Sequence, residues 1–227
     1  MSPPGETTTG GWPARCFAAV DERLQLRHPL ARVLDKPLPE GITWYHCFGG
    51  MTFFTFVVLT VTGVVLAFFY VPSPDHARAS VAWIGSSLPF GSLIRNLHRW
   101  SAYAMVVLVF CHMVRVFVHG AYRKPREMNW VVGVLMLIVV LAFGFTGYLL
   151  PWDQKAYWAT NVGINMAGSV PFVGTWIADL LRGGPELGAL TLLRFYAVHV
   201  FVLPAVLVMG LVLHFAMVRR QGIATPL

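Results

Sequence analysis

Four of the eight histidines lie in long apolar stretches and form two regularly spaced pairs. His98 and His112 are 14 residues apart. His199 and His214 are 15 residues apart. At about 100° and 1.5 Å per helical residue, 14 residues separate two side chains by ~40° and ~21 Å, and 15 residues by ~60° and ~22 Å. Each helix therefore presents two imidazoles on one face at two depths.

Two such helices predict two bis-histidine haem sites. We expect them to face each other antiparallel, with His98 level with His199 near one membrane surface and His112 level with His214 near the other. Imidazole is a common axial ligand of haem iron, so two b-type haems stacked across a membrane would let an electron cross it. The alternative is a lone polar histidine, hydrogen-bonded inside the bundle, and two matched pairs argue against it.

Glycines repeat with the same period as the histidines. Gly49 and Gly63 are 14 residues apart, and so are Gly133 and Gly147. Because glycine lets a flat ring or another backbone approach closely, these positions predict room for two porphyrins between the helices. Ordinary packing of small residues between helices is the alternative explanation.

Two arginines stand three residues from a predicted ligand. Arg95 precedes His98, and Arg115 follows His112. Pairing of a guanidinium with a carboxylate is strongest where water is scarce, so we expect both arginines to bind haem propionates. The alternative is that they lie near helix ends and extend toward lipid headgroups.

The elements that must position these residues are four apolar stretches. The 227 residues are 56% hydrophobic and 12% charged, which excludes an ordinary soluble domain. A transmembrane helix needs about 20 apolar residues, and four ranges meet this requirement: 45–71, 94–118, 130–150 and 195–218. We therefore predict an all-α membrane protein, built as a four-transmembrane-helix haem-binding bundle.

The remaining segments are more polar. Residues 1–40 form a separate N-terminal segment, in which 12–26 has the pattern of an amphipathic helix on the membrane surface. Residues 41–227 form the haem-binding domain, with short interfacial helices over 157–166 and 173–181 between the third and fourth spans. No cleaved signal sequence is expected.

The 17 basic residues indicate topology. They are spread between apolar stretches instead of lining one polar face, so the net charge of +7 does not indicate nucleic-acid binding. Eleven lie in the N-terminal segment, the second connection and the C-terminus, against six elsewhere. We therefore expect both termini on the negative, cytoplasmic side of a bacterial plasma membrane, with a thylakoid membrane as the alternative.

Several local motifs carry a family resemblance that covers nearly the whole chain. They are CFGG at 47–50, LHRWS at 97–101, KPRE at 124–127, GYLLPWDQ at 147–154, LRFY at 193–196 and RQGI at 220–223. Together they resemble the cytochrome b family of quinol oxidoreductases, in the short, split form called cytochrome b6. The 15-residue interval between His199 and His214 is similar to that branch, whereas longer cytochromes b have 14.

The resemblance implies three redox groups and two quinone sites. Cys47 matches a cysteine that binds a c-type haem covalently, although its chemistry alone is that of any single thiol. Quinol would be oxidised near the positive side, with one electron crossing through both b haems and the Cys47 haem to a quinone near Arg219. Proton release and uptake on opposite sides would make the complex proton-translocating. No residue of this chain is assigned a catalytic role.

The resemblance also implies partners. The sequence stops after the fourth span, so we expect a subunit-IV-like membrane protein to complete the quinol oxidation site. A Rieske iron–sulfur protein and a c-type cytochrome or plastocyanin-type acceptor would take electrons, and the complex would be dimeric and surrounded by lipid. Alone, the chain should bind haem without oxidising quinol.

Two other functions compete with this one. A di-haem membrane anchor of a formate dehydrogenase or hydrogenase also has four helices and histidine ligands. The restriction of the ligands to two helices and the sequence PWDQ at 151–154 favour the quinol oxidoreductase. A haem-free scaffold or transport subunit is the second competitor, and a colourless purified protein would support it.

Overall fold

The computed structural model describes residues 11–13, 16, 41–222 and 224. The chain divides into two units, Met1–Glu40 and Gly41–Leu227, and the second contains every element discussed below. Trp12, Pro13 and Cys16 are helical, but the rest of the surface helix predicted over 12–26 lies outside the described residues. That helix therefore stays a prediction.

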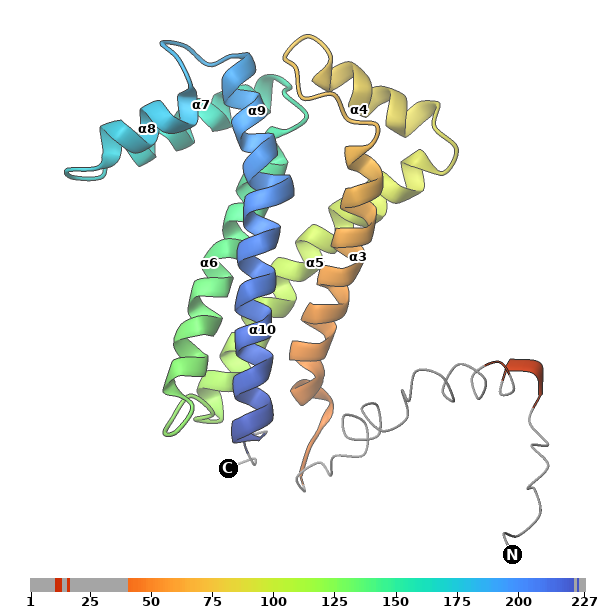
Figure 1. The fold of residues 1–227 in the computed structure, drawn as a ribbon, viewed down its shortest axis with the longest axis vertical. Coiled ribbons are helices and arrows are strands. Elements are labelled where there is room, and N and C mark those ends of the chain that lie inside the picture. Colours follow the sequence, from red (N-terminus) through yellow and green to blue (C-terminus); the bar gives the residue numbers. More distant parts are fainter. Residues whose placement is uncertain (1–10, 14–15, 17–40, 223, 225–227) are drawn as a thin grey trace, which may run out of the picture. The chain divides into compact units, whose positions relative to one another are not determined.

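Four helical segments of the described chain are long and apolar enough to cross a membrane, which confirms the predicted all-α architecture (Figure 1). The first, α3, follows a short 3-10 turn, and the fourth is a continuous run of three elements. The bounds are η1 (Trp44–Cys47), α3 (Phe48–Ala67), α5 (Gly91–Val118), α6 (Glu127–Leu149), α9 (Ala189–Ala197), η2 (Val198–Val202) and α10 (Leu203–Gln221).

The four spans alternate in direction, so α5 and α10 run the same way (Figure 1). The expectation of an antiparallel pair was wrong, because the second and fourth of four consecutive spans must be parallel. Parallel helices place the first histidine of each pair at one end and the second at the other. The expected levels, His98 with His199 and His112 with His214, are therefore those of the structure.

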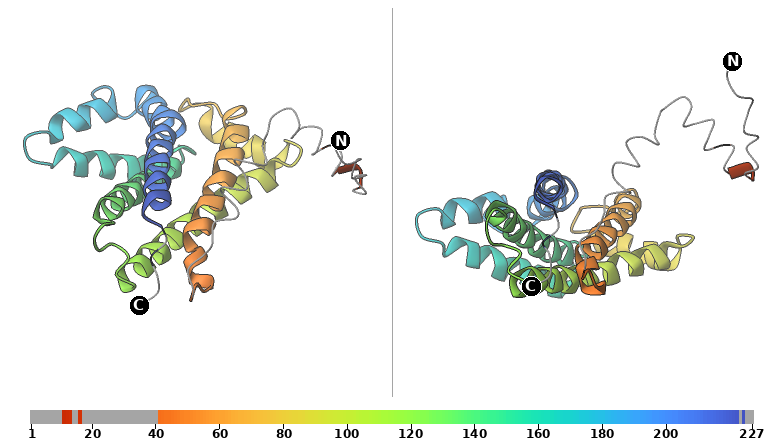
Figure 2. Two further views of the ribbon diagram at one scale, coloured as in Figure 1. Left: turned by 60° about the horizontal axis from the view of Figure 1, so that its bottom comes forward. Right: turned by 90° about the horizontal axis from the view of Figure 1, so that it is seen from below.

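The spans pack in two pairs, α3 along α5 and α10 along α6, as the view along the helices shows (Figure 2). A small apolar core joins three of them. Met105 and Val109 of α5 contact Val140 of α6 and Leu207 of α10, and all four are at most 7% exposed. This core lies midway along the spans, because Met105 is seven residues from both His98 and His112 on α5.

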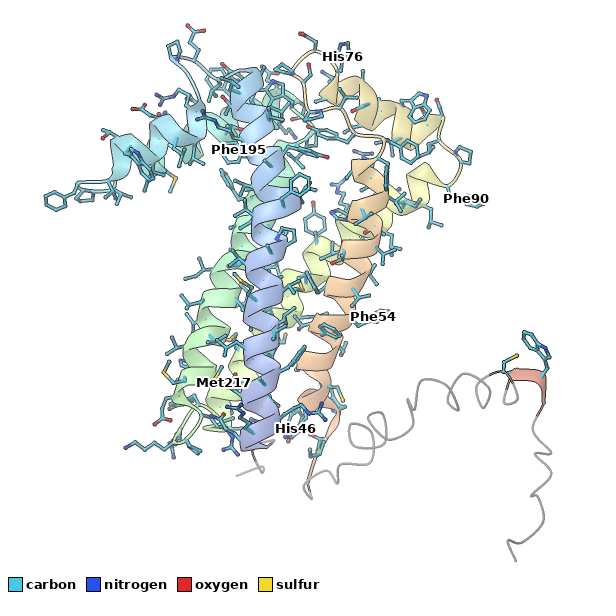
Figure 3. All side chains as sticks on the ribbon, in the orientation of Figure 1. His46, Phe54, His76, Phe90, Phe195 and Met217 are labelled. Carbon is cyan, nitrogen blue, oxygen red and sulfur yellow. The ribbon has the colours of Figure 1, made fainter. Side chains whose placement is uncertain are left out.

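The outward faces of the spans are apolar and exposed. Phe54 of α3 is 68% exposed and points away from the other helices (Figure 3). On α5, Val107 and Val114 are exposed to a similar degree. Exposed apolar surface of this extent faces lipid or another membrane protein, not water.

Short helices cover one end of the bundle. The predicted range 157–166 lies within α7 (Gln154–Gly168), and 173–181 overlaps α8 (Gly174–Arg182) in all but its first residue. The Asp153 carboxylate accepts a hydrogen bond from the Ala156 amide at 2.9 Å and so begins α7. A further helix, α4 (Ala77–Ser86), was not predicted.

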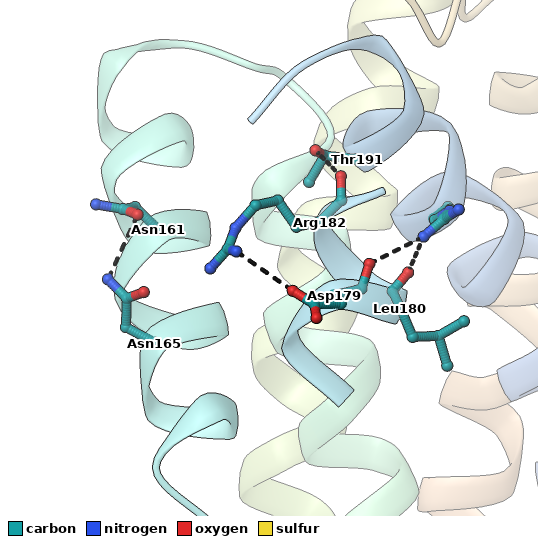
Figure 4. Close-up of polar contacts among 7 residues, drawn as sticks. Asn161, Asn165, Asp179, Leu180, Arg182 and Thr191 are labelled. Carbon is teal, nitrogen blue, oxygen red and sulfur yellow. Dashed lines mark hydrogen bonds and ion pairs between the residues drawn. The ribbon is translucent and has the colours of Figure 1, made fainter. Parts of the chain in front are cut away.

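We call the end that carries α4, α7 and α8 the α4 end, and the opposite end the Cys47 end (Figure 1). At the α4 end, Arg194 ties α9 to α8. Its guanidinium donates to the Asp179 carbonyl at 3.3 Å and to the Leu180 carbonyl (Figure 4). The Thr191 hydroxyl donates to the Arg182 carbonyl at 2.5 Å. A cation is favourable at these carbonyl groups near the end of a helix. Arg194, which lies five residues before His199, therefore anchors α8 to α9.

Tyr70 fastens the same end by linking the end of α3 to α6 and α9. Its hydroxyl donates to the Leu150 carbonyl at 2.6 Å, and its ring stacks on Tyr196 with centroids 5.4 Å apart. Burial, and then the nearby Tyr196, raise the pKa of Tyr70. The hydroxyl therefore stays protonated and remains a donor.

Candidate functional site

His98 of α5 lies against a threonine and a glycine of α3. Its Nδ1 is 2.8 Å from the Thr62 hydroxyl oxygen. A Cβ added to Gly63 would lie only 3.2 Å from Cε1 of the same ring. Gly63 is therefore the position on α3 where the imidazole ring of His98 approaches the backbone. The room for a porphyrin expected from the glycine period stays a prediction.

His199 in the fourth span has the same environment on α6. Its Nδ1 is 2.9 Å from the Thr146 hydroxyl oxygen. A Cβ on Gly147 would lie 2.7 Å from Cε1 of the ring, a distance that real Cβ atoms do not adopt. The two histidines of the α4 end are thus each held by a Thr-Gly pair from a neighbouring helix.

Both threonines determine which imidazole nitrogen carries the proton. The Thr62 hydroxyl lies 2.7 Å from the Val58 carbonyl, and the Thr146 hydroxyl 2.8 Å from the Ala142 carbonyl. A hydroxyl has one proton, which it donates to that carbonyl, so its oxygen accepts a hydrogen bond from Nδ1–H of the histidine. The other nitrogen, Nε2, then keeps its lone pair, which is the form that ligates a metal.

The histidines of the Cys47 end face each other across the bundle. The ring centroids of His112 and His214 are 6.4 Å apart and the rings are nearly perpendicular, at 79°. Two imidazoles bound to opposite sides of one metal, with bonds of about 2 Å, have centroids roughly 6 Å apart. The spacing therefore fits a metal between them. A Cβ on Gly49 would lie 3.1 Å from Cε1 of His112, so this glycine also faces a ring.

The two pairs differ in their surroundings. The nearest atom to a Cβ on Gly133 is Sδ of Met113 at 3.9 Å, so the fourth predicted glycine does not contact a histidine. Nδ1 of His214 is buried without a hydrogen-bond partner among the described residues. Hydroxyl groups thus orient the histidines of the α4 end, whereas Nδ1 of His214 has no such contact among the described residues.

Cys47 ends the η1 turn, and its thiol is exposed and free. It lines an open, mostly apolar depression of about 530 Å³ beside the first turns of α3. Met51, Phe54 and Leu108 supply apolar walls, and Thr55 a hydroxyl. Of the other cysteines, Cys111 is partly buried on α5 and Cys16 is exposed. Cys47 thus combines an exposed thiol with an adjoining depression.

The two arginines predicted to bind propionates have different positions. Nε and Nη2 of Arg115 are buried at the Cys47 end and have no hydrogen-bond partner within the described part of the chain. Nη1 of Arg95 instead lies 3.7 Å from the Cβ position of Gly85 on α4. Arg115 therefore offers unused donors to an anionic group, whereas Arg95 lies against α4. Arg219 is in the last turn of α10, also at the Cys47 end.

The sequence prediction missed the threonines. It named Gly63 and Gly147 from their period but not the residue before each. The recurrence of Thr-Gly at both positions, one on α3 and one on α6, is the signal that could have identified Thr62 and Thr146. A threonine in a transmembrane helix is commonly satisfied by its own backbone, which hides its second contact.

Comparisons with known proteins identify relatives along most of the chain. A family model described as "Cytochrome b/b6/petB" matches residues 33–222. Two proteins are named "Menaquinol:cytochrome c reductase cytochrome b subunit". The one from Geobacillus thermodenitrificans is 47% identical to this chain, and the one from Bacillus subtilis (strain 168) is 46% identical. Each alignment covers 92% of this chain and 96% of the relative. The "Cytochrome b6" of Trichodesmium erythraeum (strain IMS101) is 42% identical over 91% of this chain and 93% of its own length.

A solved structure is also similar. A chain of a "Hyperthermophilic respiratory Complex III" matches with a TM-score of 0.85 and 30% sequence identity. The match covers 92% of this chain and 56% of that chain. The present chain therefore spans little more than half the length of this structural relative.

Proposed function

The chain belongs to the cytochrome b/b6 family, and on this basis we propose that it is the di-haem, electron-carrying subunit of a membrane quinol oxidoreductase. One observation carries the proposal. Two histidine pairs from α5 and the fourth span lie at two levels, and glycines approach three of the four rings closely. Paired neutral imidazoles beside glycine backbone are the donor set and the space that a haem needs.

His98 and His199 would hold one b-type haem, and His112 and His214 the other. Haem iron supplies one-electron transfer when it is bound. Thr62 and Thr146 orient the first pair of imidazoles, so that Nε2 of each remains available. The apolar core around Met105 keeps water from the region between the two levels.

Cys47 would bind a third haem covalently. Its thiol would add across a vinyl group, with sulfur bonding to one carbon and the proton passing to the other. The exposed thiol and the adjoining depression of about 530 Å³ support this assignment. Arg115, two of whose buried nitrogens have no hydrogen-bond partner among the described residues, is the preferred partner for a propionate at the Cys47 end. Arg95 is the weaker candidate because it lies against α4.

The quinone sites would lie at opposite ends. We assign quinol oxidation to the α4 end, on the positive side, and quinone reduction to the Cys47 end near Arg219, on the negative, cytoplasmic side. The names of the relatives from Geobacillus thermodenitrificans and Bacillus subtilis favour menaquinol as the quinol and a cytochrome c as the acceptor. They also favour a bacterial plasma membrane.

The proposed complex includes further subunits. A Rieske iron–sulfur protein and a c-type cytochrome would receive electrons, and a second membrane protein would complete the quinol oxidation site in a dimeric assembly. The structural relative is nearly twice as long as the matched region, which supports such a membrane subunit. The relatives favour this assignment over a formate dehydrogenase or hydrogenase anchor.

The test is the haem content of the purified full chain. We expect a pyridine haemochrome spectrum to give two haems that acid-acetone extracts and one that it does not. Cys47→Ser should lose only the retained haem, whereas His98→Ala and His112→Ala should each lose one extractable haem. Two extractable haems with none retained would remove the Cys47 assignment alone. A chain without any haem would refute the proposed function.

A further inference from the structure

The fourth span is not a regular α-helix where it carries His199. Val198–Val202 form η2, a π-helical turn between α9 and α10. The Leu203 amide donates to the Val198 carbonyl, five residues earlier, in place of the usual four. A turn closed over five residues contains one residue more than an α-helical turn.

Pro204 lies two residues after this turn, in the first turn of α10. Proline is tolerated in the first turn of a helix because it has no amide proton to donate. π turns of this kind occur frequently at functional sites. In this chain, the widened turn contains a predicted haem ligand.

The extra residue matters for the direction of the two histidines on this span. In a regular helix, the 14 residues from His98 to His112 leave a ~40° offset in one sense, and 15 residues would leave ~60° in the other. The two helices would then differ by about 100°, a full residue step. If one residue is absorbed in the π turn, the 15 residues from His199 to His214 span four turns as 14 residues do.

We propose that the π turn at Val198–Val202 absorbs the surplus residue of the 15-residue interval and so brings His199 and His214 into the same register as His98 and His112. The inference rests on the proposed haem function. Both ends of the interval support it, because His199 contacts Thr146 and Gly147 while His214 faces His112 at 6.4 Å. Apart from His199 itself, the residues of the π turn are positioning residues and are not proposed to touch a haem.

Two single-residue deletions separate register from spacing. Deletion of Val202 removes a residue from the π turn, and deletion of Val212 removes the same residue type from regular α10. The two side chains are 51% and 65% exposed, so little packing is lost in either case. Both deletions shorten the interval from 15 to 14 residues. Only the first removes the surplus residue where the helix accommodates it.

We expect the chain without Val202 to keep both b-type haems and to accumulate in membranes like the unaltered chain. The chain without Val212 should retain at most one, because the π turn and the shortened interval together shift the register by ~100°. Haem is measured per chain recovered, and potentiometric titration against His98→Ala identifies which haem is lost.

Other results would overturn the proposal. Loss of a haem from the Val202 deletion, or its failure to accumulate, would show that the turn does more than absorb a residue. Two haems in both deletion variants would show that the register of His199 and His214 does not depend on the π turn. Absence of haem from the unaltered chain would instead refute the proposed function, and is therefore a separate outcome.

Discussion

The hydroxyl oxygen of Thr146 on α6 lies 2.9 Å from Nδ1 of His199 on the fourth span. Thr62 and His98 repeat this contact on α3 and α5 at 2.8 Å. Two helices that carry no proposed histidine ligand therefore orient one ligand on each of the other two. Outer contacts of this kind fix the ring and its tautomer, and they tune the metal that the ring binds.

Thr146→Val keeps the shape of the side chain and removes the hydroxyl. We expect roughly 10- to 100-fold weaker haem retention at the α4 end and a changed midpoint potential for that haem, since Nδ1–H of His199 loses its acceptor. Potentiometric titration measures both effects. Thr146→Ser restores the oxygen and should restore the potential, and the haem of His112 and His214 is the internal control. An unchanged potential in the valine variant would contradict the role of Thr146.

A series of alanine substitutions at the four glycines should follow the distances to their neighbours. Gly147→Ala, whose Cβ would lie 2.7 Å from His199, is expected to be the most damaging, at about 1–3 kcal/mol of strain. Gly49→Ala and Gly63→Ala, at 3.1 and 3.2 Å, should have intermediate effects. Gly133→Ala, with nothing nearer than 3.9 Å, is the matched control. Thermal loss of haem absorbance ranks the four, and equal loss at Gly133 and Gly147 would contradict the series.

Arg115→Met removes buried guanidinium donors while keeping much of the apolar stem. We expect weaker retention of the haem held by His112 and His214, by about 1.5–3 kcal/mol for a charge-assisted hydrogen bond. Haem transfer to an acceptor protein measures the loss. Arg95→Met is the comparison and should have a smaller effect, because that side chain lies against α4. The reverse order would place the propionate partner at Arg95.

Tyr70→Phe removes the hydroxyl that joins α3 to the end of α6. We expect a loss of roughly 1 kcal/mol in the stability of the α4 end near neutral pH. Because the pKa of Tyr70 is raised in the folded chain, its contribution is complete below the ordinary tyrosine value of about 10 and declines as pH rises above it. Melting curves between pH 8 and about 11 should therefore converge for the two proteins. Parallel curves would contradict this.

The sequence by itself determined the four spans, the spacing of both histidine pairs, the four glycines of the same period and the family. These features repeat with the helical period or occur as contiguous motifs, so they are local properties of the chain. The same holds for α7 and α8, whose apolar patches were visible as short runs.

Only the tertiary structure decided how those features meet. Hydrogen bonds such as Thr146 to His199 join residues 53 positions apart, and no local pattern specifies them. The position of Gly133 beside Met113 depends on how α6 rotates against α5, which packing decides. The π turn likewise lies inside a continuous apolar stretch, whose pattern did not distinguish it from a regular helix. Periodicity determines which face of a helix a residue occupies, whereas contacts between helices determine what that face touches.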